Sequence, residues 1–381
     1  MKILILSCNT GGGHNTAARA MKEEIERQGH EAIVLDYLAL ANQITSNLIS
    51  SSYINMARYS PHFFGMIYRT SMAISTNRHL SPVYYANIPI AKRLAAYLEE
   101  NPVDGIVMTH LFAMEGLSYL RRRGDALPVN VAIATDYTCQ PFWEDLDCDY
   151  YVLPHEDLID EYASRGLPPD RLRAYGIPVS SQFSREENRG DARRRLNLPE
   201  EEPLFLVMGG SMGSGHILTF TERLLAEVRN GTIAVICGSN QKLLSAMEER
   251  FSREPRVRLI GFTNEVADYM SACDVLYTKP GGLTSTEALV RNVPLIHTAP
   301  IPGCETANSR FFAEHGISFS AHTIEEQIRY GCDLAQNAVI QREMMRRQSK
   351  NARPDAARKI LALIEEKAQA RRPGKTDPPK E

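Results

Sequence analysis

Short apolar runs alternate with longer amphipathic stretches along this chain of 381 residues, and the alternation restarts near the middle. The first series lies at residues 3–6, 32–35, 105–108, 129–134 and 150–153, and the second at 204–208, 232–237, 257–260, 274–277 and 294–297. Runs this short, rich in Leu and β-branched residues and separated by helical patterns, predict parallel strands covered by helices. We therefore expect an α/β protein with two similar halves.

The chain is longer than the size at which a single core stops growing, which also favours two domains. A turn-rich, charged segment at 176–199 separates the two series, so we expect an amino-terminal domain at 1–178 and a carboxyl-terminal domain at 179–365. The polar residues 366–381 include three prolines near their end, which predicts a disordered tail.

The overall composition is that of a soluble globular protein. A net charge of −3 with 43% apolar residues argues against a general nucleic-acid binder. The seven cysteines are scattered without a Cys-x-x-Cys pair, which indicates free thiols in a reducing compartment and no zinc site. No apolar run approaches the ~18 residues needed to span a bilayer, and the first apolar run is too short for a signal peptide. Any membrane contact should therefore be peripheral.

A Pro-Gly-Gly turn at residues 280–282 follows the strand predicted at 274–278 and opens a helix. Free backbone N–H groups and the positive end of the helix dipole suit a phosphate at such a turn. Glu287 lies on the first turns of that helix, where a carboxylate can accept hydrogen bonds from vicinal ribose hydroxyls. The motif predicts a nucleoside diphosphate site; the alternative is a simple turn with an exposed glutamate.

The first strand runs into Gly11, Gly12, Gly13 and His14, and a helix follows. This spacing matches neither a P-loop nor a dinucleotide fingerprint. The dipole keeps a histidine at a helix start neutral, as a general base for an attacking hydroxyl must be, and the carboxyl ends of parallel strands are where ligands bind. We expect His14 to be catalytic; the alternative is a histidine that only caps the helix.

Smaller signals follow other strands of the second series. The glycine-rich segment 209–215 can approach a phosphate closely, with Gly210 at its start and Ser211 as a hydroxyl donor. Ser239 follows another strand, and Phe262 could pack on a base. Asp145 and Asp147 have the spacing of metal-binding transferases, but the acidic run reads better as the solvated start of a strand. No metal site is predicted.

Residues 37–98 contain no Asp or Glu, although an average stretch of 62 residues in this chain would hold about seven. The segment carries five basic residues among many aromatic and Met side chains. Cations beside such side chains suit an anionic lipid surface. We expect a membrane-docking segment, with Arg58, Phe63, Phe64 and Arg69 among its contacts; the alternative is a helical core with ordinary arginines.

Several motifs together resemble those of the bacterial and plant glycolipid synthases that move a hexose from a UDP-sugar to diacylglycerol. These enzymes are relatives of the transferase that adds N-acetylglucosamine to the peptidoglycan lipid precursor. The motifs are Gly11 to His14 with Ala17 and Ala18, Thr135 and Asp136 followed by Trp143, and the segments 176–178, 279–289 and 300–303. They span roughly residues 2–365. Where the family usually has glutamine after Pro-Gly, this chain has Cys304.

The resemblance implies a GT-B fold, with two Rossmann-like domains facing each other across a cleft. It implies an inverting transfer without a metal, in which His14 activates the acceptor hydroxyl and Asp136 lines the acceptor cleft near Gly12, Gly13 and Trp143. On the donor side it implies that the diphosphate, the ribose and the hexose contact these residues: Gly281, Gly282, Leu283, Thr284, Glu287, Glu305 and Asn308. The implied partners are a UDP-hexose, diacylglycerol and an anionic lipid surface on the inner face of the cell membrane.

Three alternatives stay open on the sequence. The acceptor could be another lipid, such as an undecaprenyl-linked one. UDP-N-acetylglucosamine 2-epimerases share the architecture, but their chemistry needs no apolar acceptor surface. A membrane-associated UDP-sugar sensor without catalysis is the non-enzyme alternative, and Cys304 is its motivation. The residues do not distinguish a glucose donor from a galactose donor.

Overall fold

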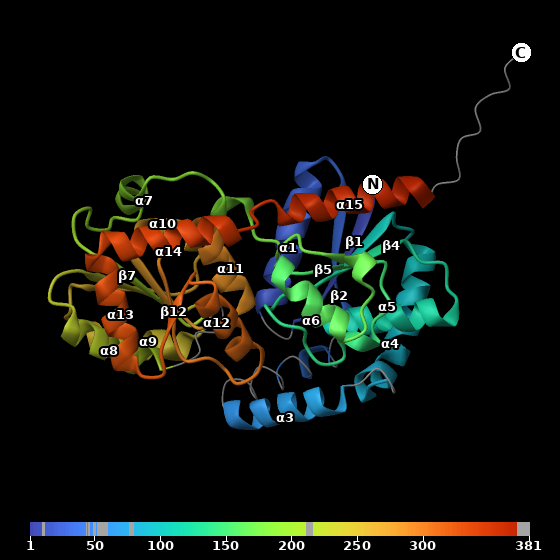
Figure 1. The fold of residues 1–381 in the computed structure, drawn as a ribbon, viewed down its shortest axis with the longest axis horizontal. Coiled ribbons are helices and arrows are strands. Elements are labelled where there is room, and N and C mark those ends of the chain that lie inside the picture. Colours follow the sequence, from blue (N-terminus) through green and yellow to red (C-terminus); the bar gives the residue numbers. More distant parts are fainter. Residues whose placement is uncertain are drawn as a thin grey trace, which may run out of the picture.

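Two parallel sheets, each with helices packed around it, lie side by side (Figure 1). The computed structural model describes residues 1–9, 12–42, 44, 46–48, 51, 60–75, 80–210 and 216–371. The first sheet has the strand order β2-β1-β3-β4-β5-β6, and the second has β12-β11-β10-β7-β8-β9. All strand pairs are parallel. The strand order reverses at β1 and at β7, which are the switch points where open α/β sheets bind ligands.

All ten predicted strands are present, with ends within one residue of the prediction. The strands of the first sheet are β1 (Lys2–Ser7), β2 (Glu31–Asp36), β3 (Gly105–Met108), β4 (Val129–Ile133), β5 (Tyr150–Val152) and β6 (Leu172–Arg173). Those of the second are β7 (Leu204–Met208), β8 (Thr232–Ile236), β9 (Val257–Ile260), β10 (Val275–Thr278), β11 (Leu295–His297) and β12 (Phe319–Ser320). The strands β6 and β12 were not predicted, because each has only two residues and lies at a sheet edge, so neither forms an apolar run in the sequence.

Helices connect the strands in both sheets, so the expected α/β class is confirmed. The helices of the first half are α1 (Gly12–Arg27), α3 (Pro61–Ile74), α4 (Pro82–Glu100), α5 (Leu111–Arg123) and α6 (Ile159–Ser164). Those of the second half are α7 (Arg189–Arg195), α8 (Ile217–Glu227), α9 (Gln241–Phe251), α10 (Val266–Ala272), α11 (Gly282–Arg291), α12 (Cys304–Glu314), α13 (Ile324–Gln336) and α14 (Ala338–Asn351). Local chemistry sets several ends: Ser81 caps α4 through the Tyr84 N–H, and Gly124 ends α5 in the left-handed conformation.

The last helix, α15 (Ala356–Arg371), crosses back to the first domain (Figure 1). Its apolar residues Ile360 and Ile364 join the core formed by Ile3 and Val131. This corrects two expectations. Residues 356–365 belong to the first domain rather than the second, and residues 366–371 are helical rather than disordered. The sequence suggests otherwise because these residues follow the second domain directly and are rich in charge. Residues 372–381 lie outside the described part.

The acid-free segment divides into two structural parts. The short helix at Tyr37–Leu40 and the helix α4 bury Tyr37, Leu38 and Leu94 in the main core, so the expectation that all of 37–98 docks on a membrane is wrong for these parts. The helix α3 differs, because Phe63, Met66, Ile67 and Ile74 are 39–53% exposed. Of the eleven large apolar side chains that the structure describes as exposed, seven lie between residues 37 and 98. The exposed apolar surface is therefore concentrated in this part of the chain.

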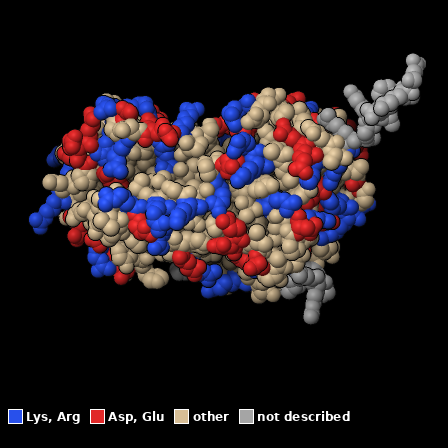
Figure 2. Space-filling view, turned by 45° about the horizontal axis from the view of Figure 1, so that its top comes forward, with Lys and Arg blue, Asp and Glu red and all other residues tan. Residues whose placement is uncertain are grey.

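Charged side chains of both signs are scattered over both domains on the face shown in Figure 2. The largest core cluster contains residues of both domains, among them Ala134 and Tyr137 from the first and Leu283 and Phe311 from the second. The two sheets are thus joined by shared packing. Within the described ranges, no helix has both the length and the apolar character needed to cross a bilayer.

Candidate active site

His14 lies in the first turn of α1 and is held by a bond to the end of the neighbouring strand. Its Nδ1 donates to the carbonyl oxygen of Thr109 at 2.6 Å, because a carbonyl can only accept. In the neutral ring, Nε2 then carries the lone pair. Burial lowers the pKa of His14, and the ring packs edge-on against His110 at 4.6 Å between centroids. The imidazole is therefore oriented and neutral, as a proton acceptor requires.

Asp136 follows β4 and faces His14 across a small cavity. This cavity of about 10 Å³ is lined by His14, Asp136 and Trp143, among others. Burial raises the pKa of Asp136 to about 6, against the lowering effect of its hydrogen bond from Asn308. Trp143 is 4% exposed and packs edge-on against Tyr162. The three residues expected on the acceptor side are thus together, but they enclose little space in this conformation.

Five of the donor-side residues that the structure describes line a larger cleft cavity of about 460 Å³ between the domains. Both domains contribute predicted residues to its wall, which includes Gly12, Gly13, Gly210, Phe262, Leu283, Thr284 and Glu287. A volume of this size is in the range of small-molecule sites. Phe262 is 70% exposed, so its ring is available to a ligand. Burial raises the pKa of Glu287 to about 8, so this carboxyl is mostly protonated at neutral pH.

The first residues of α11 are closed by the other domain. A Cβ built on Gly282 would lie 1.9 Å from the carbonyl oxygen of Thr135, so only glycine fits there. Gly281 has more room, since its nearest contact would be the Glu305 carboxylate at 3.8 Å. Gly282 is thus buried and Gly281 half-buried, and Leu283 and Thr284 are the residues of the helix start that line the large cavity.

Two residues expected to meet the hexose are engaged with the protein. Asn308 is fully buried; its Nδ2 donates to Asp136 at 2.7 Å and to the Pro280 carbonyl at 2.9 Å, and its Oδ1 accepts the Tyr137 N–H at 2.7 Å. In this conformation Asn308 holds the domains together, and its expected contact with a sugar hydroxyl stays a prediction. Glu305 accepts from Lys279 Nζ at 2.6 Å and from the Ile301 N–H at 2.9 Å.

Sequence reasoning missed two cations at the cleft. Arg19 lines the large cavity from the exposed side of α1, and its charge lowers the pKa of Glu287. Lys279 follows β10 and pairs with Glu305 while packing near Gly210, which has a left-handed φ of 69°. Arg19 follows Gly12 by seven residues, a spacing that places both on one face of the helix and could have indicated it. Lys279 stood inside the quoted motif without an assigned role.

Some expected site residues cannot be placed. Ser211, Arg58 and the side chain of Phe64 lie outside the described part of the chain. Ser239 is exposed in the turn after β8, next to Gly238, which lines the cleft. Arg69 is exposed on α3.

The acidic run expected to be solvated is instead largely buried. Asp145 is 3% exposed and accepts the Ser81 N–H, and Asp149 is 9% exposed and pairs with Arg121 and Arg371. These carboxylates connect helices to the strand, so the expectation of a solvated strand start was wrong. Asp147, the second carboxylate of the Asp-x-Asp spacing, is half-buried and pairs with Arg171 at 3.0 Å.

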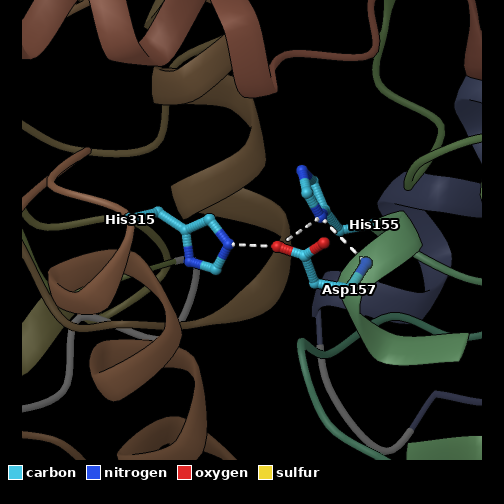
Figure 3. Close-up of side chains that lie close together, drawn as sticks. All are labelled: His155, Asp157 and His315. Carbon is cyan, nitrogen blue, oxygen red and sulfur yellow. Dashed lines mark hydrogen bonds and ion pairs between the residues drawn. The ribbon is translucent and has the colours of Figure 1, made fainter. Parts of the chain in front are cut away.

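One group of side chains could hold a metal ion by proximity. The ligand atoms of His155, Asp157 and His315 lie within 4.8 Å of one another (Figure 3). However, His155 Nδ1 accepts the Asp157 N–H at 3.2 Å, and His315 Nε2 lies 2.8 Å from Asp157 Oδ2, a hydrogen-bond distance. His315 Nδ1 donates to the Phe311 carbonyl at 2.7 Å, so Nε2 needs a second proton to meet the carboxylate. The contacts therefore describe an ion pair between the domains.

Two facing Rossmann-like domains with a ligand-sized cleft between their switch points define the GT-B class of glycosyltransferase folds. Comparison with known proteins agrees. Residues 14–179 match the family model of monogalactosyldiacylglycerol (MGDG) synthase, and residues 188–355 match that of glycosyl transferases group 1. The crystal structure of MurG from Acinetobacter baumannii matches with a TM-score of 0.64 and 18% identity, covering 96% of this chain and 99% of that one. This last likeness shows the fold alone.

Two relatives are similar over most of the chain. The processive diacylglycerol beta-glucosyltransferase of Staphylococcus saprophyticus is 28% identical over 331 residues, which cover 86% of this chain and 83% of the relative. The chloroplastic monogalactosyldiacylglycerol synthase of Spinacia oleracea is 28% identical over 381 residues, which cover 96% of this chain and 72% of the relative. The chain is thus a homologue of the diacylglycerol glycosyltransferases, and the resemblance found in its motifs is confirmed.

Proposed function

We propose that this protein is an inverting glycosyltransferase that moves a hexose, glucose or galactose, from a UDP-sugar to diacylglycerol or a glycosylated diacylglycerol. The observation that carries the proposal is the placement of His14 across the cleft from α11. His14 is neutral, is fixed through Nδ1 and has its lone pair on Nε2. His14 lines the small cavity with Asp136, and Leu283, Thr284 and Glu287 of α11 line the large cavity, whose wall also includes Gly12 and Gly13 just before His14. The two relatives named above supply the substrate class.

The reaction is a single displacement at the anomeric carbon. The acceptor hydroxyl oxygen forms a bond to that carbon as the bond to the UDP oxygen breaks, and the hydroxyl proton passes to His14 Nε2. The departing diphosphate gains negative charge, which the first turn of α11 stabilises through its free N–H groups at Leu283 and Thr284, the residues that line the cavity. Attack from the opposite face gives the β-glycoside from an α-linked donor.

The transfer proceeds without a metal ion in this proposal. Arg19 supplies positive charge in the cleft wall, Lys279 lies beside Gly210 of that wall while paired with Glu305, and the helix dipole of α11 adds to their charge. Their combined charge takes the place that a divalent ion has in metal-dependent sugar transferases. Activity that survives EDTA supports this assignment, and loss of activity that Mg²⁺ or Mn²⁺ restores contradicts it.

The protein acts at the inner face of the cell membrane, where it binds an anionic lipid surface through α3. Support comes from the exposed apolar side chains of α3, with Arg69 beside them, in a segment that contains no acid. Apolar side chains enter the headgroup region, and each basic residue contributes about 1 kcal/mol near anionic lipid. Vesicle flotation tests this: binding should need anionic lipid and weaken with salt.

The deciding experiment incubates the protein with labelled UDP-glucose or UDP-galactose and diacylglycerol vesicles, and analyses the lipid fraction. A β-linked hexosyl diacylglycerol supports the proposal, and the two donors together decide the sugar. UDP binding without any lipid product would support a sensor instead. Product only with an undecaprenyl-linked acceptor would move the activity to another lipid.

A further inference from the structure

Helix α3 contacts both domains. Its carboxyl-terminal end is held by the first domain, where the Phe142 N–H donates to Ser75 Oγ at 2.8 Å and Arg165 lies 3.2 Å from Met72 Sδ. Its middle packs on the second domain: a Cβ on Gly65 would lie 2.6 Å from Pro302 Cβ, which leaves no room for a side chain. The helix runs along the lower edge of both lobes in Figure 1. It is therefore a bridge between the domains.

The part of the second domain that α3 contacts is the turn before α12. Gly303 has a φ of 124°, which favours glycine, and a Cβ there would lie 3.1 Å from Tyr68 Cγ. The turn continues to Glu305, whose carboxylate holds both the Ile301 N–H and Lys279. Lys279 leads directly into the glycines that open α11. A shift of the turn would therefore be transmitted to the donor side of the cleft.

Tyr68 also belongs to the neighbourhood of the acceptor site. Burial raises the pKa of its hydroxyl above the ordinary value, and the nearby Asp136 carboxylate acts in the same direction. The phenol is thus a neutral group within electrostatic reach of Asp136. The same side chain contacts Gly303 through its ring.

The two faces of α3 have different partners. Gly65, Tyr68 and Met72 follow each other at intervals of three and four residues and face the protein. The other side carries exposed apolar side chains: Met66 lies three residues and Ile67 four residues after Phe63, and Ile74 lies seven residues after Ile67. Intervals of three, four and seven place residues on one side of a helix. A partner that binds the exposed side of α3 therefore also restrains the opposite side, which contacts the turn at Pro302 and Gly303.

We propose that α3 couples membrane binding to donor binding, with Gly65 and Tyr68 as positioning residues. The inference rests on the proposed function, because it assumes the lipid surface and the nucleotide site named there. A bilayer that binds α3 in this orientation keeps the turn at Pro302 and Gly303 in place, and with it the start of α12 and Lys279. Such coupling is reciprocal, so a nucleotide in the cleft must strengthen binding to the bilayer by the same factor.

The test measures UDP affinity of the full-length protein by calorimetry, with and without vesicles of phosphatidylcholine and phosphatidylglycerol. We expect the wild type to bind UDP about five- to tenfold more tightly with vesicles, within the usual range of coupling between sites. Flotation with and without UDP should show the same factor. Vesicles that leave the UDP affinity of the wild type unchanged, or a wild type that does not bind vesicles, would overturn the proposal.

Two variants assign the coupling to α3. Gly65→Ala favours the helix by ~1 kcal/mol in propensity, so it keeps α3 folded while its Cβ collides with Pro302. Tyr68→Ala removes the ring from Gly303. Both should still float with vesicles and bind UDP in their absence, but they should lose the enhancement. Thr70→Ala, exposed on the same helix, is the matched control and should keep it.

If Gly65→Ala keeps the full enhancement, the inference is wrong. Neither UDP calorimetry nor vesicle flotation involves sugar transfer, so failure of the coupling can be told apart from failure of the proposed function. Coupling without any lipid product contradicts the transferase, and lipid product without coupling contradicts only the role of α3.

Discussion

The helices α1 and α11 face each other across the cleft, and both begin at a glycine after a parallel strand. They differ in what they offer to a ligand. The α1 side holds a side chain, His14, whose ring is fixed by the Thr109 carbonyl and kept neutral by burial. The α11 side offers backbone amides and a buried carboxyl, Glu287, with a pKa raised to about 8. The same local fold thus serves a proton acceptor on one side and a leaving-group site on the other.

The sharpest way to break this comparison is to remove the base. His14→Ala should lower the rate of transfer by about 10² to 10⁴, the usual contribution of a general base, and leave UDP affinity nearly unchanged. Initial rates with diacylglycerol vesicles and calorimetry with UDP measure the two effects. Equal losses of transfer and of UDP affinity would show that His14 belongs to the nucleotide site or to the fold of that turn.

The second test concerns the contact between the two sides. Gly282→Ala places a Cβ 1.9 Å from a main-chain oxygen of Thr135, so the domains must move apart. Since a misplacement of about 1 Å can cost 10² in rate, we expect a loss of that order in kcat/KM. Gly281→Ala is the matched control, because its φ of −72° suits any residue and its nearest contact is at 3.8 Å. Similar losses in both variants would contradict the importance of this contact.

Strand positions could be predicted because each buried strand is a separate apolar run, and His14 and Glu287 because they follow glycine turns at strand ends. The engagement of Asn308 with Asp136 could not be predicted, since it depends on how the two domains close. The return of α15 to the first domain was missed for the same reason: its partners Ile3 and Val131 are more than 200 residues away in the sequence. The acid-free segment did not reveal that α3 is exposed while α4 is buried, because both carry apolar residues.

A smaller effect sharpens the role of Glu287. With a pKa of about 8, this carboxyl is roughly nine-tenths protonated at pH 7. If ribose hydroxyls donate to it, UDP binding favours the ionised form, so a proton is released and affinity rises about tenfold between pH 7 and 9. Calorimetry in buffers of different ionisation enthalpy counts the proton. Glu287→Gln should bind UDP with neither the proton release nor the rise, and a wild type with flat affinity over this range would show that Glu287 does not contact the ribose.

Without a ligand, the same raised pKa affects stability. The folded protein retains a proton on Glu287 that the unfolded chain has lost, so this group lowers stability as pH rises from the ordinary carboxyl value toward 8. In Glu287→Gln the free energy of unfolding should no longer fall with pH on account of this group. Urea unfolding at pH 5 and pH 8 compares the two proteins, and an equal pH dependence in both would contradict burial of this carboxyl in the free protein.

The smallest expected effect concerns the pair of Asp157 and His315, which joins the domains outside both cavities described above. The pair needs a protonated imidazole, because His315 Nδ1 already donates to the Phe311 carbonyl. The hydrogen bond holds the pKa of Asp157 below its ordinary value, so the contribution of this carboxylate is present above that ordinary value and is lost as pH falls through the folded pKa.

Asp157 is 59% exposed, so the pair should contribute at most about 1 kcal/mol to the free energy of unfolding. Asp157→Asn should therefore destabilise the protein slightly in urea at pH 6 and less at pH 3, while the exposed Asp160→Asn on α6 should behave alike at both. His155, Glu156 and Arg353 also face this site, and the variant leaves the ion pair of Glu156 with Arg353 in place. An equal cost at both pH values would contradict the lowered pKa of Asp157. Stabilisation by Zn²⁺ that Asp157→Asn abolishes would instead make the three side chains a metal site, since a bound ion would explain the close approach of His315 Nε2 and the Asp157 carboxylate without a proton between them.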